Sequence, residues 1–158
     1  MARRVTPATI ALDRAGVAYT LATYDYDPNA DRIGMQAAEA LGAPPSEGLK
    51  TLIVRADGKP ACVVLASDRE VSMKKLAAAL RAKACEMMPP ADAERITGYR
   101  VGGVSPFGQK KPLPTVIDAE AAGLALAFMN GGQRGLQVKL APADTVMLLA
   151  ATVAAIAV

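Results

Sequence analysis

The sequence predicts a single compact domain spanning residues 1–158, of α/β class (α+β mixed), in which a mixed, barrel-like β-sheet is flanked by short helices. The chain has 158 residues, 52% of them hydrophobic and 21% charged, which suffices for one buried core. Short helical and extended segments alternate along it, with no repeat and no linker. Two hairpin turns, at Asp57-Gly58 and Gly131-Gly132, argue against an all-parallel sheet.

The first half of the chain is expected to hold two helices, a β-rich segment and a hairpin. Thr6 is a favourable N-cap with Pro7 at the first helical position, and Gly16 ends that helix. A second short helix stops at Gly42, and the Asp57-Gly58 turn joins two apolar strands. The expected bounds after the first helix are a β-rich segment at 17–24, a helix at 35–41, and strands at 49–56 and 60–66.

The second half is expected to alternate in the same way. Ser72 caps a helix whose apolar residues share one face, and Gly98 stops the helix after it. A glycine- and proline-rich loop at 101–113 separates these helices from the last elements. The expected bounds are helix 73–81, strand 84–88, helix 91–97, strand 115–118, helix 119–124, strands 126–130 and 136–140, helix 142–149 and strand 153–158.

The chain contains no histidine. This removes the usual general base near neutral pH, and with it any Ser-His-Asp or Cys-His mechanism. Two cysteines, Cys62 and Cys85, cannot fill the four positions of a zinc site without histidine. We therefore expect no metal and no cofactor, and we expect both thiols to be reduced and buried.

Charge and hydropathy indicate a cytoplasmic protein. The 18 Lys+Arg and 15 Asp+Glu give a formal charge of +3, which is compatible with a polyanionic partner. Asp13 and Arg14 interrupt the N-terminal apolar stretch before a signal core can form. The uncharged run 145–158 is shorter than the roughly 20 residues of a spanning helix, so we expect a buried helix followed by a buried strand, and no contact with a membrane.

Three short motifs fail as catalytic signatures. Ser72 to Lys75 matches S-x-x-K without the companion motifs of penicillin-binding enzymes. Residues 42–51 lack the GK[ST] of a phosphate loop and lead into a strand rather than a helix. Ser105 lacks the glycine two residues later that a nucleophile elbow needs, and no histidine exists to activate it.

Lys50 begins a strand that is apolar on both faces, and two interpretations of it remain open. If its face belongs to the core, desolvation lowers the pKa of the lysine and makes the amine available for polar chemistry. Otherwise Lys50 is a strand-end lysine that extends to water.

Two glycine-rich turns are candidate ligand-binding loops. The Gly102-Gly103 pair can present backbone N–H groups to a carbonyl or phosphate oxygen, with Lys110 and Lys111 just beyond it. The second turn follows Asn130 and carries Arg134, which is either a phosphate contact or a solvated side chain. Each loop is also explained by turn chemistry alone.

The chain resembles the YbaK/EbsC family, relatives of the editing domain inserted in bacterial prolyl-tRNA synthetases, and above all its Cys-tRNA(Pro) deacylase branch. The matching stretches cover essentially the whole chain: TPA at Thr6, TYDYDP at Thr23, LKTLIV at Leu49, SMKKLAAAL at Ser72, TGYRVGGVSPFGQKKPLPTVID at Thr97 and NGGQRGL at Asn130. The resemblance implies hydrolysis of a mischarged aminoacyl ester at the 3′ end of tRNA(Pro). It implies that the substrate's own thiol attacks the ester while the protein aligns it.

The resemblance and the loops together define the expected site. The family's essential lysine falls on Lys50, which we expect to be catalytic. The expected substrate-binding residues are Tyr24, Thr51, Gly102, Gly103, Ser105, Pro106, Asn130, Gly131 and Gly132. Relatives differ at three positions: they often carry histidine at Tyr26, a small hydroxyl residue at Asn130 and an acid at Gln137.

The sequence therefore predicts a trans-editing deacylase for Cys-tRNA(Pro), with aminoacylated tRNA(Pro) and prolyl-tRNA synthetase as expected partners. One alternative is a deacylase for another small aminoacyl-tRNA, such as Ala-tRNA(Pro). Another is a non-catalytic module that binds tRNA or the synthetase. The sequence predicts no oligomeric state.

Overall fold

The computed structural model describes residues 5–29 and 35–158. Its elements are α1 (Pro7–Arg14), β1 (Thr20–Thr23), α2 (Gln36–Ala40), η2 (Pro45–Glu47), β2 (Leu49–Ala56), β3 (Lys59–Ala66), α3 (Met73–Ala79), β4 (Cys85–Met87), α4 (Pro90–Thr97), β5 (Thr115–Asp118), α5 (Ala119–Ala122), β6 (Ala127–Asn130), β7 (Leu136–Leu140), α6 (Pro142–Leu149) and β8 (Thr152–Ala154). Element types agree with the predicted ones except that η2 lies in an expected connector, and bounds agree within three residues except that β8 ends at Ala154 instead of residue 158.

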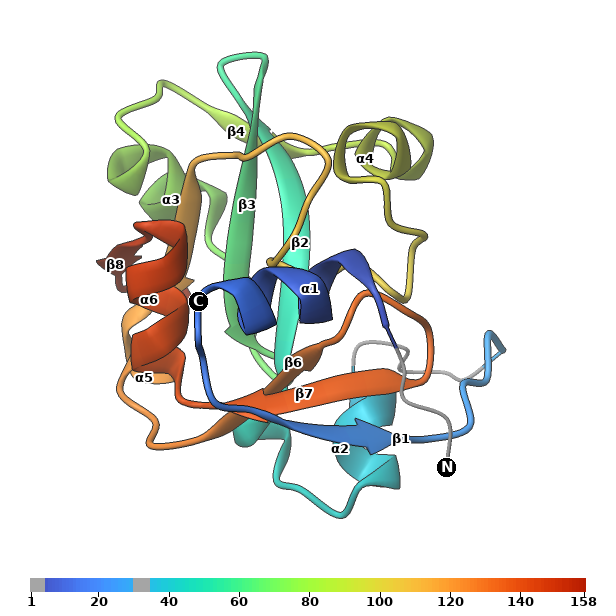
Figure 1. The fold of residues 1–158 in the computed structure, drawn as a ribbon. Helices are drawn as coiled ribbons and strands as arrows, with labels where there is room; N and C mark the ends of the chain where they lie inside the picture. The colour runs from blue at the N-terminus through green and yellow to red at the C-terminus, as the bar shows by residue number, and fades with distance from the viewer. Residues whose placement is uncertain (1–4, 30–34) are drawn as a thin grey trace.

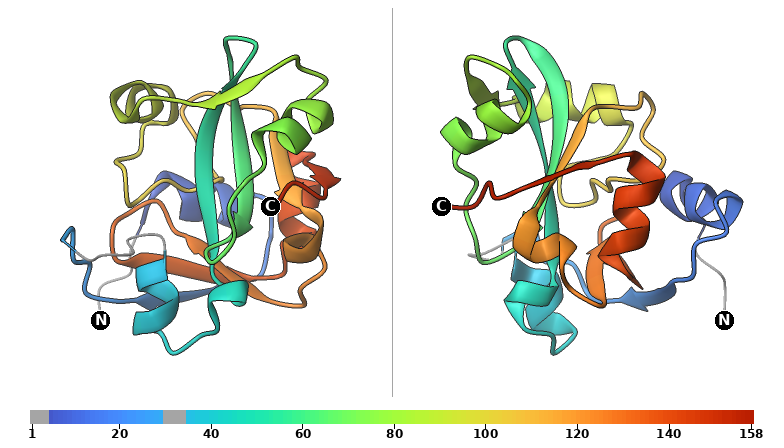
Figure 2. Two further views of the ribbon diagram at one scale, coloured as in Figure 1. Left: turned by 180° about the vertical axis from the view of Figure 1, so that it is seen from behind. Right: turned by 90° about the vertical axis from the view of Figure 1, so that its left-hand side faces the viewer.

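The strands form two sheets. A mixed five-stranded sheet has the order β4-β2-β3-β5-β8, and an antiparallel three-stranded sheet has the order β1-β7-β6. Figure 1 shows β2 and β3 running upright while β1, β6 and β7 cross below them, and Figure 2 shows the helices around this frame. The mixed sheet and short helices are thus confirmed, but the barrel-like closure is wrong: among the described residues only an isolated bridge, Gly48 to Phe128, links the two sheets.

The hairpin of β2 and β3 sets the position of Lys50. Asp57 and Gly58 both have positive φ, +50° and +81°, which suits the right-handed twist of the two strands. A two-residue turn fixes the register, so Lys50 lies opposite Leu65 and Leu49 opposite Ala66. One end of the hairpin is therefore the turn, and the other end carries Lys50.

The upright sheet is buried on both faces. In β3, Cys62 and Val64 point into the core between the two sheets, whereas Val63 and Leu65 pack on the opposite face with Leu76 of α3. Alternation of side chains in a strand requires this division when both faces are covered. The apolar character of both faces, seen in the sequence, has this origin.

Local capping agrees with the sequence. The Thr6 hydroxyl accepts a hydrogen bond from the Thr9 N–H at 3.1 Å, and the Thr9 hydroxyl accepts one from the Thr6 N–H at 2.9 Å. Ser72 caps α3 through the Lys75 N–H, and Gly98 ends α4 with a φ of +81°. Both thiols are free, as expected, although Cys85 is only partly buried.

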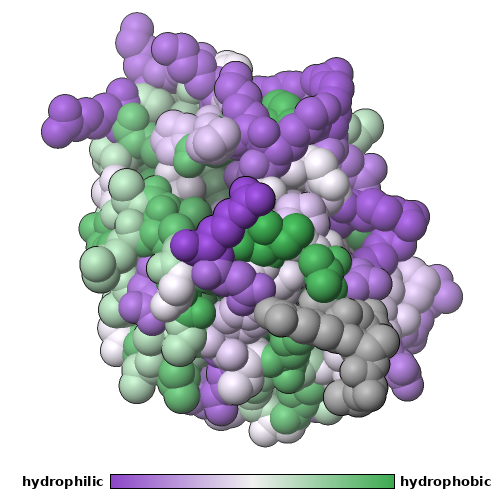
Figure 3. Space-filling view, viewed as in Figure 1, coloured by the Kyte–Doolittle hydropathy of each residue, from purple (hydrophilic) through white to green (hydrophobic). Residues whose placement is uncertain are grey.

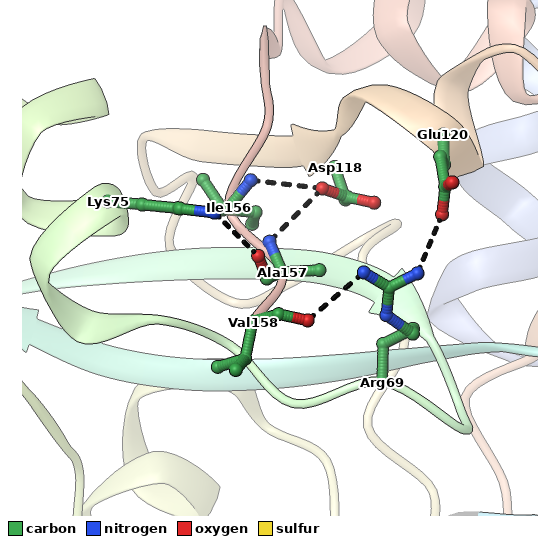
Figure 4. Close-up of polar contacts among 7 residues, drawn as sticks. All are labelled: Arg69, Lys75, Asp118, Glu120, Ile156, Ala157 and Val158. Carbon is green, nitrogen blue, oxygen red and sulfur yellow. Dashed lines mark hydrogen bonds and ion pairs between the residues drawn. The ribbon is translucent and has the colours of Figure 1, made fainter.

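The C-terminal segment differs from its prediction as a buried helix and strand. Met147 is 80% exposed and Val153 47% exposed, because α6 covers the core with one side only and β8 is an edge strand. Beyond β8, buried Asp118 accepts hydrogen bonds from the N–H groups of Ile156 and Ala157, as Figure 4 shows. Within the described ranges, no helix is both long and apolar enough to cross a membrane.

Candidate functional site

A cavity of about 300 Å³ opens where the first residues of β2 meet α2, α4, the Gly102 loop and the strands β6 and β7. Its polar lining comes from Tyr24, Lys50, Thr51, Ser67, Asn130 and Gln137. Its apolar lining includes Ile53, Met87, Met88, Pro90, Ala93 and Val104. A concave, mostly apolar site with a few converging polar groups is typical of small-ligand recognition.

Lys50 lines this cavity and is partly buried. Burial lowers the pKa of the amine, and the carboxylates of Glu70 and Asp68 partly offset that effect. No carboxylate in the described part of the chain forms an ion pair with Lys50. The amine is therefore positioned to interact with a ligand, which agrees with the first of the two sequence interpretations.

Thr51 lines the same cavity from the next position of β2. Its Oγ1 is buried and has no hydrogen-bond partner among the described residues. A buried hydroxyl without a partner costs about 1–3 kcal/mol. Since this oxygen is not accessible to solvent, a polar group of a ligand would reach it only after a rotation of the Thr51 side chain.

Tyr24 and Gln137 form the side of the cavity built by the small sheet. The Tyr24 N–H donates to the Gly135 carbonyl at 2.9 Å, and its side chain hydrogen-bonds that of Gln137, which is 5% exposed. Burial and the nearby Tyr26 raise the pKa of the Tyr24 hydroxyl, and interactions of this hydroxyl with the Gly135 backbone and the Gln137 side chain lower it in part. Tyr24 is thus a neutral group at neutral pH that can donate a hydrogen bond.

Asn130 connects the two glycine-rich loops. Its Nδ2 donates to the Gly102 carbonyl at 3.1 Å, and its Oδ1 accepts from the Gly132 N–H at 2.7 Å. Of the expected binding residues, Tyr24, Thr51, Gly102 and Asn130 line the cavity with Lys50. Gly131 and Gly132 follow Asn130 and do not line the cavity. The Gly131 carbonyl accepts a hydrogen bond from the Thr6 hydroxyl at 2.6 Å.

The remaining expected residues lie outside the cavity lining. The Gly103 N–H donates to the Arg100 carbonyl at 2.8 Å and is therefore already engaged within its own turn. Ser105 is completely buried, and its hydroxyl accepts from the Phe107 N–H at 3.1 Å. Pro106 is buried beside it. Their observed contacts shape the loop that carries Gly102.

Several lining residues were not expected from the sequence. Met87 ends β4, Met88 follows it, and Pro90 and Ala93 belong to α4. No sequence pattern relates this segment to Lys50. Ser67 could have been found: the hairpin register that pairs Leu49 with Ala66 continues to place Ser67 beside Gly48. The Ser67 N–H and hydroxyl both donate to the Gly48 carbonyl.

Comparison with known proteins shows the family to which the chain belongs. The family model described as "Aminoacyl-tRNA editing domain" matches residues 27–148. A protein of Enterococcus faecalis provisionally named Cys-tRNA(Pro)/Cys-tRNA(Cys) deacylase EbsC is 36% identical over 121 residues, covering 75% of this chain and 74% of the relative. A proline--tRNA ligase of Acidithiobacillus ferrooxidans is 34% identical over 90 residues, which are 57% of this chain and 16% of the ligase.

A solved structure shares the fold. The crystal structure of a protein provisionally described as a trans-editing enzyme for prolyl-tRNA synthetase superposes with a TM-score of 0.81 at 21% identity, over 96% of this chain and 95% of the other. The family resemblance seen in the sequence is thereby confirmed. This chain belongs to the aminoacyl-tRNA editing domain family.

Proposed function

We propose that this protein is a trans-editing aminoacyl-tRNA deacylase that hydrolyses Cys-tRNA(Pro), with Lys50 holding the ester in the cavity. The observation that carries the proposal is that the partly buried Lys50 and Thr51, whose hydroxyl has no partner among the described residues, both line a cavity of about 300 Å³. The Enterococcus faecalis relative bears the name of a deacylase for the same ester. A deacylase that is separate from prolyl-tRNA synthetase would remove a wrongly attached amino acid after the tRNA has left the synthetase.

The cavity favours catalysis without a protein nucleophile. Its hydroxyl groups belong to Tyr24, Thr51 and Ser67, and none of the described lining residues carries a carboxylate that would act as their base. The whole chain lacks histidine. Positioning and charge stabilisation, rather than attack by a side chain, are the contributions that these residues can make.

The substrate thiol supplies the nucleophile in this proposal. The sulfur of the cysteinyl group attacks its own carbonyl carbon, the bond from that carbon to the ribose oxygen breaks, and the thiol proton ends on that oxygen. The released thiolactone then reacts with water to give cysteine. Lys50 stabilises the negative charge that develops on the carbonyl oxygen, and Thr51 and Tyr24 hydrogen-bond the ester and ribose region.

This chemistry also accounts for selectivity that binding alone would not supply. An apolar pocket distinguishes side chains that differ by one methylene by only about 1–3 kcal/mol. A thiol that must take part in the reaction adds a chemical requirement that alanine does not meet.

The experiment compares mischarged tRNAs with the purified protein. Cys-tRNA(Pro), its S-methyl derivative and Ala-tRNA(Pro) are incubated in parallel, with the Lys50→Ala variant as a control. Rapid loss of the Cys ester alone supports the proposal. Equal rates for the S-methyl ester would refute thiol participation, a faster reaction of the Ala ester would favour the alternative deacylase, and tRNA binding without cleavage of any ester would favour the non-catalytic module.

A further inference from the structure

Arg134 and Tyr26 form a stacked pair beside the cavity. The guanidinium carbon of Arg134 lies 5.1 Å from the centre of the Tyr26 ring. The ring rests on Gly102, which lines the cavity: a Cβ atom at Gly102 would lie 2.5 Å from the Tyr26 hydroxyl. The pair is therefore adjacent to the expected position of the substrate ester.

The Arg134 side chain is held in one orientation. Its Nε donates to the Val101 carbonyl at 2.8 Å, and Val101 also lines the cavity. The backbone is held as well, because a Cβ atom at Gly103 would lie 2.8 Å from the Arg134 nitrogen. The loop after α4 and the turn between β6 and β7 meet here, on the right of Figure 1.

The described residues make no hydrogen bond or ion pair with the two terminal nitrogens of Arg134. Within residues 5–29 and 35–158, the recorded contacts of the guanidinium are the Tyr26 ring and the Val101 carbonyl. An arginine fixed on one face and at Nε offers its remaining N–H groups in a preorganised fork, which matches the oxygen atoms of a phosphate. An arginine that only extended into solvent would make neither the stacking contact with Tyr26 nor the hydrogen bond to the Val101 carbonyl.

The surroundings favour an anionic ligand. Arg100 precedes Val101, and Lys110 lies close to the start of this loop, since its N–H donates to the Thr97 carbonyl at 2.8 Å. Figure 3 shows hydrophilic residues gathered over the upper right of this face, where α4 and the loop after it lie. Arg100, Lys110 and Arg134 are the cations of this side that attract a polyanion, and the Glu94 carboxylate is occupied by the Val101 N–H, from which it accepts at 2.8 Å.

We propose that Arg134, held by Tyr26 and Val101, forms a subsite for a backbone phosphate of the RNA, next to the cavity that receives its acylated 3′ end. This inference rests on the proposed function and adds to it: the cavity recognises the ester, and the Arg134 subsite anchors the nucleotide chain. Arg134 is a binding residue and takes no part in bond breaking.

The test measures binding of an uncharged RNA hairpin with a CCA end, by fluorescence anisotropy at several salt concentrations. Arg134→Gln is expected to weaken binding about tenfold and to reduce the salt slope by about one. The matched control is Lys139→Gln, which removes one positive charge from an exposed lysine stacked on Phe128, 5.4 Å from its ring centre, and is expected to change neither quantity. Unchanged affinity and slope in Arg134→Gln would overturn the inference.

Two further variants separate orientation from charge. Tyr26→Phe keeps the ring and is expected to bind RNA as the parent does, whereas Tyr26→Leu removes the stack and is expected to weaken binding. Arg134→Lys keeps the charge but not the fork, so it should retain the salt slope with reduced affinity. Equal affinity of Tyr26→Leu and Tyr26→Phe would contradict the role of the stack.

Two further measurements complete the test. One distinguishes RNA phosphate from free phosphate, and the other distinguishes failure of this inference from failure of the proposed function. Inorganic phosphate is titrated in parallel: if Arg134→Gln loses phosphate binding while RNA binding is unaffected, the site takes a free anion and the inference is wrong. The hairpin carries no ester, so Arg134-dependent RNA binding without deacylation would refute the proposed function and leave this subsite standing.

Discussion

Asn130 donates a hydrogen bond from Nδ2 to the carbonyl of Gly102, 28 residues away in sequence, and this contact at 3.1 Å fixes one wall of the cavity. The other end of the same amide accepts from the Gly132 N–H. One side chain thus orients both glycine-rich loops. Since Gly102 lines the cavity and lies against Tyr26, the Asn130 amide connects the cavity lining to the stacked pair of Tyr26 and Arg134.

Asn130→Asp is expected to reduce kcat/KM for the aminoacyl ester about tenfold. The aspartate still accepts from the Gly132 N–H but has no donor for the Gly102 carbonyl, and a lost hydrogen bond of this kind is worth about 0.5–1.5 kcal/mol before repulsion is added. Steady-state deacylation kinetics measure the effect. A variant with parental kcat/KM would show that the Gly102 carbonyl does not need the amide.

Lys50→Ala is expected to lower kcat about 10²–10³-fold, the range typical of removing one donor from developing negative charge. Lys50→Arg should recover part of the rate because it keeps the charge in altered geometry. Single-turnover deacylation measures both, with thermal melting to show that the variants are folded. Full turnover by Lys50→Ala would remove Lys50 from the mechanism.

The pH dependence of stability follows from the pKa of Lys50, which burial lowers from 10.5. Below the folded-state pKa both states carry the proton, so the folded state bears the whole penalty of burying the charge. As pH rises from the folded pKa towards 10.5 the unfolded state binds more protons, so the free energy of unfolding increases. Lys50→Met should therefore stabilise the protein most at neutral pH, with a smaller difference above pH 10. Urea unfolding at several pH values measures this trend, and a difference that grows with pH would contradict it.

Glu70 and Asp68 keep the pKa of Lys50 higher than burial alone would leave it. In the proposed mechanism the rate falls at high pH, where Lys50 loses its proton; this fall is the Lys50-dependent limb of the pH–rate profile. The double variant Asp68→Asn/Glu70→Gln is expected to move this limb to lower pH. The control, Glu86→Gln, removes a carboxylate opposite Arg55, about 17 Å further along β2, and should leave the limb in place. An unshifted limb in the double variant would mean that these carboxylates do not act on Lys50.

The two cysteines should differ in reactivity. Burial raises the pKa of Cys62 to about 11, and Cys62 is fully buried, whereas Cys85 is partly exposed. Since the thiolate is the reactive form, iodoacetamide at pH 8 is expected to modify Cys85 in the native protein and both residues only after unfolding. Mass spectrometry of peptides measures the modification, and rapid labelling of native Cys62 would contradict the burial.

Asp118 is expected to be a major stabilising residue, because one carboxylate oxygen accepts two N–H groups of the C-terminal segment (Figure 4). Asp118→Ala leaves both buried N–H groups without a partner and should cost about 2–4 kcal/mol, or a fall in Tm of roughly 4–16 °C for a chain of this size. Asp118→Asn retains an acceptor and should cost less. Calorimetry measures Tm, and equal losses in the two variants would point to charge rather than to these hydrogen bonds.

The local structure of the chain was predictable because it depends on short-range rules. The Asp57-Gly58 turn determines the register of β2 and β3, and Thr6 and Gly98 mark the ends of α1 and α4. The site was predictable only in part. Lys50, Thr51 and Tyr24, which the resemblance singled out, line one cavity, and their roles there stay a prediction. The engaged Gly103 N–H and the buried Ser105 hydroxyl show that a motif does not reveal where each of its groups points.

The sequence by itself determined the class of fold, the hairpin that carries Lys50 and the absence of a histidine-based mechanism, because turn chemistry, side-chain alternation and composition are properties of neighbouring residues. Only the tertiary structure decided that Met88 and Ala93 line the cavity, that Asn130 joins two distant loops, that Tyr26 stacks on Arg134 and that the two sheets do not close into a barrel. These contacts join segments far apart in the chain, and their geometry depends on how the whole core packs.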